Sequence, residues 1–353
     1  MWRMEYNASS SGSNDEAVVN VVEAVCNPYV VPSVAEYFAA FNVLGLWLFS
    51  LGGVAVFITV ALFADTIRSI IRTAPINTRS HSAFVVSVYP VVAIVTFCAT
   101  LVPRAQVITE AVSQGMFMCC MYQLFCLIVA YGGGETQLVK KLQPAQISLQ
   151  VAPCCCWSCC SFLPVYPLTK ERLKILRALV VQLPVVQAFS YIAMLVMWSD
   201  DQKLYPLNYN YYQPVVVTSI LLGIWGMVMM VRLSQEGLKE YFVQGKFIVL
   251  QLVLLLTKFQ GLAARTLAMG SLFPCRSHIT PTVYTNLIYN SALLWEMVLL
   301  AGFARLLYKK PVPESYQMDK NSNLPKQLCT LQEKITISES ITQESVKSPV
   351  AKY

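Results

Sequence analysis

The chain has 353 residues, of which 56% are hydrophobic and only 13% are charged, and its mean hydropathy is +0.53. These figures exclude a disordered chain, a coiled coil and an ordinary soluble enzyme. The formal net charge of +7 does not by itself indicate nucleic-acid binding, because Lys and Arg of a membrane protein gather on one side of the bilayer. The sequence therefore predicts a membrane protein that binds no nucleic acid.

Long apolar runs bounded by charged residues or Pro follow one another along the chain. A transmembrane helix needs roughly 20 apolar residues to cross a hydrocarbon layer about 30 Å thick, and runs without alternation favour helices over a β-barrel. We predict an all-α polytopic fold with seven transmembrane helices, and six helices are the main alternative. The predicted spans are 40-64, 82-102, 112-131, 175-198, 213-232, 247-270 and 283-307.

The segments outside the predicted transmembrane domain, 40-307, differ in character. Residues 1-39 lack the basic start and short apolar stretch of a secretory signal, so we expect the first span to insert itself. With the orientation given below, residues 1-39 are the predicted extracellular N-terminal segment. The longest connection is a predicted cytosolic loop, 132-174. Residues 308-353 are polar and contain several Ser, Thr and Lys, which predicts a disordered cytosolic tail used for trafficking or, alternatively, for docking of another protein.

The distribution of Lys and Arg predicts the orientation. Seventeen of them fall in segments on one side of the predicted spans and four on the other, with correct alternation across every span. Positive residues collect on the cytosolic side, so we expect an extracellular N-terminus and a cytosolic C-terminus. Asn7 begins a glycosylation sequon on the predicted extracellular side and is a candidate modification site, although such tripeptides also occur by chance.

Five cysteines lie within seven residues of the predicted cytosolic loop. They are Cys154, Cys155, Cys156, Cys159 and Cys160. The reducing cytosol argues against a disulfide cluster, and a zinc site usually needs ligand pairs separated by a longer loop. Neighbouring Trp157 and Phe162, followed by a basic stretch, favour palmitoylation, which would hold the loop against the inner leaflet. We expect these cysteines to be acylated and predict no metal site.

Two further cysteines, Cys26 and Cys275, lie on predicted extracellular segments. Oxidising surroundings would allow a disulfide between them. Two unpaired thiols agree with the sequence nearly as well, because the distance between their Cα atoms cannot be read from it.

Ionisable side chains within predicted spans are functional candidates, since each costs about 2.5–3.5 kcal/mol to insert at the bilayer centre. Lys258 lies near the middle of the sixth span and Glu296 near the middle of the seventh, at similar depth. One interpretation is a structural ion pair between them. The other is a role in substrate binding or ion coupling.

Three polar residues of the sixth span repeat at intervals of seven, which places them along one helix face. They are Gln251, Lys258 and Arg265. A basic face in an apolar wall suits an amphipathic anion, and Arg104, Asn286 and Asn290 are candidates to complete the site. The alternative is that Arg265 and Arg104 extend to the membrane interface, as cations near span ends often do.

The chain carries no sequence pattern of an ATPase, a protease or an esterase. The stretch around Gly245-Lys246-Phe247 lacks the upstream Gly and the Ser or Thr of a phosphate-binding loop, and no His-Glu-x-x-His or Gly-x-Ser-x-Gly pattern occurs. We therefore predict a non-enzymatic protein without a cofactor.

Several short stretches in order resemble the alpha subunit of the organic solute transporter, a family of seven-span proteins. The five-cysteine cluster is the specific part, and about three quarters of the chain follows the same plan. The stretches are Val102-Pro103-Arg104, Gly132-Gly133-Gly134-Glu135, the segment from Pro153 to Cys160, Gly245-Lys246-Phe247 followed by Gln251, and Gln260.

The resemblance implies gradient-driven, bidirectional movement of bile acids and conjugated steroids across the plasma membrane, together with a single-span beta subunit. It implies no role for Lys258, and a homo-oligomer is also compatible with the sequence. Two other classes stay open. A palmitoylated, non-transporting membrane organiser would depend on the cysteines and the tail alone, whereas a seven-helix receptor is disfavoured because the third span ends in Tyr131-Gly-Gly-Gly and no Asn-Pro-x-x-Tyr occurs.

Overall fold

The computed structural model describes residues 32–40, 43–151, 164–200, 204–269 and 280–310. Within these ranges, seven stretches of helix are long and apolar enough to cross a membrane, which confirms the predicted all-α polytopic class. They are Gly45–Thr73, Ile76–Leu101, Pro103–Tyr131, Lys170–Asp200, Tyr211–Gly237, Val243–Ala268 and Pro281–Tyr308.

The first helices are α2 (Val34–Ala40), α3 (Val43–Thr73), α4 (Ile76–Val86) and α5 (Val88–Leu101). α4 and α5 together form the second span and meet at Ser87, whose backbone N–H donates to the carbonyls of Ala83 and Phe84 at 3.1 and 3.2 Å. The break has a local cause, because Pro90 has no N–H to donate to the carbonyl one turn earlier.

A short 3-10 turn, η1 (Pro103–Ala105), joins the second span to α6 (Gln106–Tyr131). The backbone is extended at Val102 (φ −124°, ψ 96°), so the chain reverses there within a few residues. α6 therefore begins earlier than the predicted start of the third span at residue 112. Gln106 and Glu110, which the sequence suggested were in a loop, lie on a helix.

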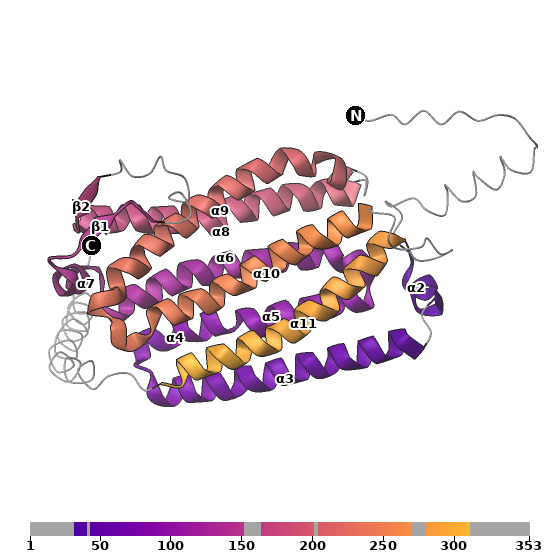
Figure 1. Cartoon of the computed structure of the whole chain (residues 1–353), viewed down its shortest axis with the longest axis horizontal. Coiled ribbons are helices and arrows are strands. Elements are labelled where there is room, and N and C mark those ends of the chain that lie inside the picture. Colours follow the sequence, from indigo (N-terminus) through magenta and orange to yellow (C-terminus); the bar gives the residue numbers. More distant parts are fainter. Residues whose placement is uncertain (1–31, 41–42, 152–163, 201–203, 270–279, 311–353) are drawn as a thin grey trace, which may run out of the picture.

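The other helices are α7 (Glu135–Leu142), α8 (Lys170–Asp200), α9 (Leu204–Gly237), α10 (Val243–Met269) and α11 (Pro281–Tyr308), with η4 (Lys239–Tyr241) before α10. α11 packs against α3, α5 and α10, whereas α6 packs against α4, α5 and α8 (Figure 1). α8 and α9 pair closely at Gly223, where a Cβ atom would lie only 2.3 Å from Cγ of Leu183. α3 exposes large apolar side chains such as Trp47 and Phe57, as a lipid-facing helix does.

The connection between α6 and α8 contains α7 and a two-stranded antiparallel hairpin, β1 (Gln146–Ser148) and β2 (Val165–Pro167). Gly133 and Gly134 adopt φ values of 84° and 102°, which favour glycine, and so turn the chain from α6 into α7. Trp225 and Arg232 on α9 donate to the backbone carbonyls of Leu149 and Gln150, at 3.2 and 3.4 Å. These bonds attach the segment that follows β1 to α9.

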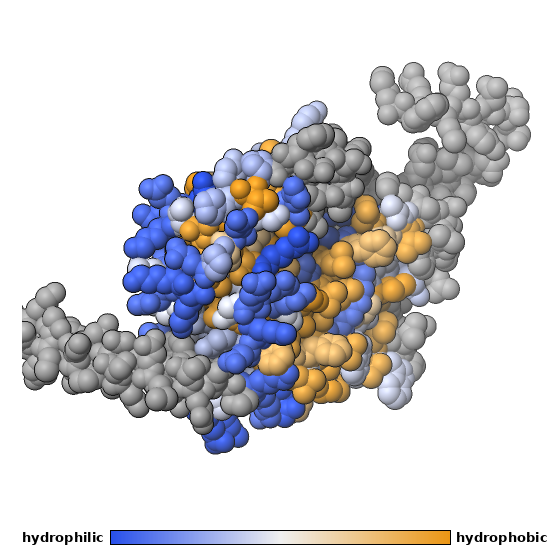
Figure 2. All heavy atoms as spheres, turned by 60° about the vertical axis from the view of Figure 1, so that its left-hand side comes forward, coloured by the Kyte–Doolittle hydropathy of each residue, from blue (hydrophilic) through white to orange (hydrophobic). Residues whose placement is uncertain are grey.

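We call the end of the bundle with α7 and the β1–β2 hairpin the hairpin end (Figure 1). The opposite end is called the cavity end, because the cavity described below lies there. Hydrophilic residues gather at the hairpin end, next to a largely apolar surface over the helices (Figure 2). Arg305 and Lys309 bind Asp65 of α3 near this end, with N to Oδ2 distances of 2.6 and 3.0 Å.

Candidate functional site

A cavity of about 930 Å³ lies between α5, α6, α10 and α11, toward the end where α6 and α11 begin and α10 ends. Tyr37 of α2 and Trp198 of α8 also contribute to its wall. This volume is within the range of about 300–1,000 Å³ typical of small-molecule pockets. The cavity is large enough for a ligand of drug or steroid size.

Five of the seven candidate binding residues line this cavity: Arg104, Lys258, Arg265, Asn286 and Asn290. They come from η1, α10 and α11, so segments far apart in the sequence contribute to one wall.

Gln251 and Glu296 do not line the cavity. Gln251 lies nearer the hairpin end of α10, and its Oε1 atom is buried without a hydrogen-bond partner among the described residues. Glu296 accepts a hydrogen bond from Nε2 of Gln260. The proposed pair with Lys258 does not form in the part of the chain that the structure describes, where neither residue is in an ion pair.

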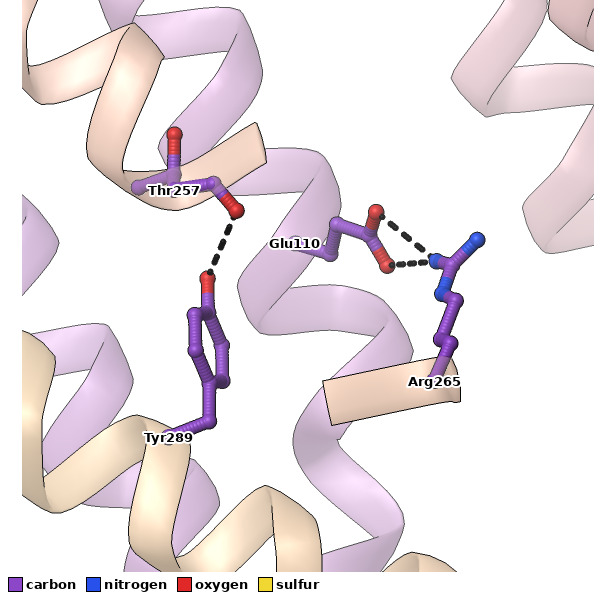
Figure 3. Close-up of polar contacts among 4 residues, drawn as sticks. All are labelled: Glu110, Thr257, Arg265 and Tyr289. Atoms are coloured by element: carbon purple, nitrogen blue, oxygen red, sulfur yellow. Dashed lines mark hydrogen bonds and ion pairs between the residues drawn. The ribbon is translucent and has the colours of Figure 1, made fainter. Parts of the chain in front are cut away.

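Arg265 of α10 donates to both carboxylate oxygens of Glu110 on α6, at 3.2 and 3.3 Å (Figure 3). Both side chains are partly exposed, at 43% for Arg265 and 28% for Glu110, so solvent screens the pair. The charged residues of the described cavity wall are Arg104, Lys258, Arg265 and Glu110. The wall therefore carries more positive than negative charge.

Glu110 was not among the candidates from the sequence, because it falls in a stretch predicted to be an extracellular loop. Gln106, Glu110 and Gln114 all line the cavity, and their spacing of four places them on one face of α6. This polar repeat was the signal that would have identified them.

Uncharged polar groups line the same space. Asn290 donates through Nδ2 to Oε1 of Gln106 at 3.0 Å, and this bond links α11 to α6. The Tyr289 hydroxyl donates to the backbone carbonyl of Thr257 at 3.4 Å (Figure 3). Four buried polar atoms of lining residues have no hydrogen-bond partner among the described residues: Thr96 Oγ1, Ser113 Oγ, Gln114 Nε2 and Asn290 Oδ1. Such atoms are unusual in proteins, and water or a ligand can satisfy them after small rotations.

Tyr37 attaches α2 to the rim of the cavity. Its side chain is almost fully buried, and its hydroxyl donates to the carbonyl of Thr100 at 3.1 Å. Burial raises the pKa of Tyr37 to about 12, above the usual value of about 10, so the hydroxyl keeps its proton further into the alkaline range.

Apolar side chains complete the wall, including Val92, Phe117, Val253, Leu287 and Leu293. An apolar cavity with several cations and amide groups can hold a molecule that is mostly hydrocarbon and carries a negative group. Among the described residues, no group of three His, Cys, Asp or Glu side chains is arranged to bind a metal ion.

The remaining candidate sites fall outside the described residues. They are the glycosylation site Asn7, the cysteines Cys26 and Cys275, and the cluster Cys154, Cys155, Cys156, Cys159 and Cys160. They stay predictions from the sequence.

Comparison with known proteins identifies the family. The family described as organic solute transporter Ostalpha matches residues 48–313, which include all seven spans except the first residues of the first. The chain belongs to the organic solute transporter Ostalpha family. It is 31% identical to the organic solute transporter alpha-like protein of Drosophila melanogaster over 80% of this chain and 85% of that protein.

Vertebrate members of the Ostalpha family are also similar. The organic solute transporter subunit alpha of Danio rerio is 22% identical over 74% of this chain and 82% of that protein. The subunit alpha of Homo sapiens is 25% identical over 75% of this chain and 77% of that protein. No solved structure matches the chain. These relatives are named as transporter subunits, so the chain is a multi-pass membrane transport protein and not an enzyme.

Proposed function

We propose that the chain is the alpha subunit of a plasma-membrane facilitative transporter for amphipathic organic anions, in particular bile acids and conjugated steroids. The observation that carries the proposal is the cavity, in which Arg104, Lys258 and Arg265 lie on an otherwise largely apolar wall. Its volume of about 930 Å³ suits a four-ring skeleton with a charged side group. The cations would bind the carboxylate or sulfate, and the apolar wall would cover the ring system.

The excess of Lys and Arg on one side supports an orientation in which the cavity end faces the outside of the cell. Under this orientation Lys140, Lys141, Lys170 and Lys239 lie at the cytosolic hairpin end. The cavity would then receive substrate from the extracellular side or the outer leaflet.

Movement down a gradient in either direction needs no nucleotide hydrolysis, which agrees with a sequence without a phosphate-binding loop. The relatives' names include the word subunit, which implies a further chain in those transporters. For this protein we propose a single-span beta subunit as that partner.

Flux measurements test the proposal directly. Cells expressing this chain, with or without a candidate single-span partner, would be assayed for uptake and efflux of a radiolabelled sulfated steroid and a bile acid after surface expression is verified. Saturable flux in both directions that requires both chains supports the proposal. No flux from a correctly delivered pair would contradict it and favour the palmitoylated membrane organiser.

A further inference from the structure

Lys246 is a buried cation at the hairpin end, far from the cavity. It lies in the first turn of α10, and only 7% of its surface is exposed. Its ammonium donates to the Tyr131 hydroxyl at 2.8 Å and lies 4.8 Å from the ring centroid of Tyr131 and 4.6 Å from that of Tyr308. The aromatic faces attract the positive charge of the ammonium.

No carboxylate balances this charge in the part of the chain that the structure describes. The four ion pairs there do not include Lys246, and Asp65 is already bound by Arg305 and Lys309. An ammonium has three N–H donors, and one hydrogen bond, to Tyr131, is found for it. A buried ammonium without a carboxylate is costly, and an anion beside it would lower that cost.

Lys246 and its two aromatic neighbours lie on the helices that also form the cavity. Tyr131 ends α6, Tyr308 ends α11, and Lys246 lies in the first turn of α10. The three residues thus come from the same helices that line the cavity at their other ends. Lys258 lies twelve positions after Lys246, which is roughly 18 Å along a helix.

A layer of buried apolar side chains separates Lys246 from the cavity. Val253 and Leu293 line the cavity. Closer to the hairpin end, the side chains of Leu127, Leu250 and Met297 are 0% exposed. In this conformation the cavity is therefore closed toward Lys246.

We propose that Lys246 is a second binding site for the anionic group of the transported molecule, used when the hairpin ends of α6, α10 and α11 move apart. The carboxylate or sulfate would replace the contacts of the ammonium with Tyr131 and Tyr308. The inference rests on the proposed function, since it takes its ligand from that function. Under this proposal, α6, α10 and α11 have one cationic site at each end of the buried apolar layer.

The test compares Lys246→Gln, which removes the charge, with Lys246→Arg, which keeps it. Half-saturating concentrations of a radiolabelled sulfated steroid would be measured separately for uptake and for efflux, in a system where the wild type is saturable in both directions. We expect Lys246→Gln to raise the half-saturating concentration of substrate on the hairpin side about tenfold, which corresponds to about 1.4 kcal/mol of binding free energy. The half-saturating concentration of substrate on the cavity side should change by less than about twofold. Lys246→Arg should stay within about threefold of the wild type on both sides.

Lys239→Gln is the matched control, because Lys239 is an exposed cation at the same end. Equal losses in Lys246→Gln and Lys239→Gln would indicate a general surface-charge effect and overturn the inference. The inference would also be overturned if Lys246→Gln left both half-saturating concentrations unchanged. The same holds if Lys246→Arg, at a normal surface level, were as impaired as Lys246→Gln. Failure of the proposed function is distinct, because then the wild type itself shows no saturable flux.

Discussion

Arg265 and Glu110 join α10 to α6 at the wall of the cavity, through two N–H···O contacts of 3.2 and 3.3 Å from one guanidinium nitrogen. Glu110 thus occupies a position on Arg265 that the anionic group of the proposed substrate would need. An incoming anion would exchange with the Glu110 carboxylate instead of meeting an unpaired guanidinium.

Replacing Glu110 with Gln should therefore tighten anion binding. The half-saturating concentration of a sulfated steroid is expected to fall by up to about fivefold, because a partly exposed ion pair is worth only about 0.2–1 kcal/mol. Concentration-dependent uptake at equal surface expression measures the change. A higher half-saturating concentration would show that Glu110 supports the site and does not compete with the substrate.

Replacing both Lys258 and Arg265 with Gln should have the opposite effect. Loss of two of the cations on the cavity wall is expected to lower the uptake efficiency for the anion at least tenfold without lowering surface expression. Arg232→Gln is a suitable control, because Arg232 lies in a span but binds the carbonyl of Gln150 away from the cavity. Unchanged uptake kinetics of the double variant would contradict the proposed role of these cations.

The number of spans and their helical class could be predicted because each span has a long apolar run. The start of the third span could not, since Arg104, Gln106 and Glu110 interrupt the hydropathy in the way that loop residues do. In the structure these side chains line a cavity, where polar groups are needed although the helix is in the membrane. Hydropathy alone does not distinguish these two environments.

The seven-residue interval of Gln251, Lys258 and Arg265 correctly indicated one helix face but not how far the cavity extends along it. Only Lys258 and Arg265 reach the cavity, because buried apolar residues close it before Gln251. Similar depth also suggested Glu296 as a partner of Lys258. Depth fixes the position along the helix axis and not the direction of the side chain, and the Glu296 carboxylate binds Gln260 instead.

The contact between α8 and α9 should be sensitive to the size of residue 223. In Gly223→Ala the new Cβ would lie 2.3–2.5 Å from three side-chain atoms of buried Leu183, so the variant is expected to lose about 1–3 kcal/mol of stability. Thermal unfolding of the purified protein measures this. Gly302→Ala is the control, because among the described residues no atom lies within 4 Å of its added Cβ apart from its chain neighbours and the backbone of its own helix.

A second substitution checks the cause of that loss. Leu183→Ala in the Gly223→Ala background removes the clashing atoms and should restore part of the stability, so the two changes should not be additive. Additive losses would place the effect of Gly223→Ala elsewhere.

The cysteine cluster makes a separate prediction from the sequence. Replacing Cys154, Cys155, Cys156, Cys159 and Cys160 with Ser should remove incorporation of a palmitate analogue and reduce delivery to the cell surface. Cys329→Ser, a change in the C-terminal segment, should leave labelling unchanged. Labelling that persists in the five-cysteine variant would place the lipid on another residue.

The register of the hairpin, in which Gln146 lies opposite Pro167 and Ser148 opposite Val165, brings the two ends of the intervening segment side by side. The free-energy cost of closing a loop grows only slowly with its length once its ends are fixed together. The chain between Val151 and Val165 should therefore accept a short peptide epitope without disturbing helix packing. Such an insertion would allow antibody labelling of this side of the membrane in intact and permeabilised cells, and so a direct assay of topology.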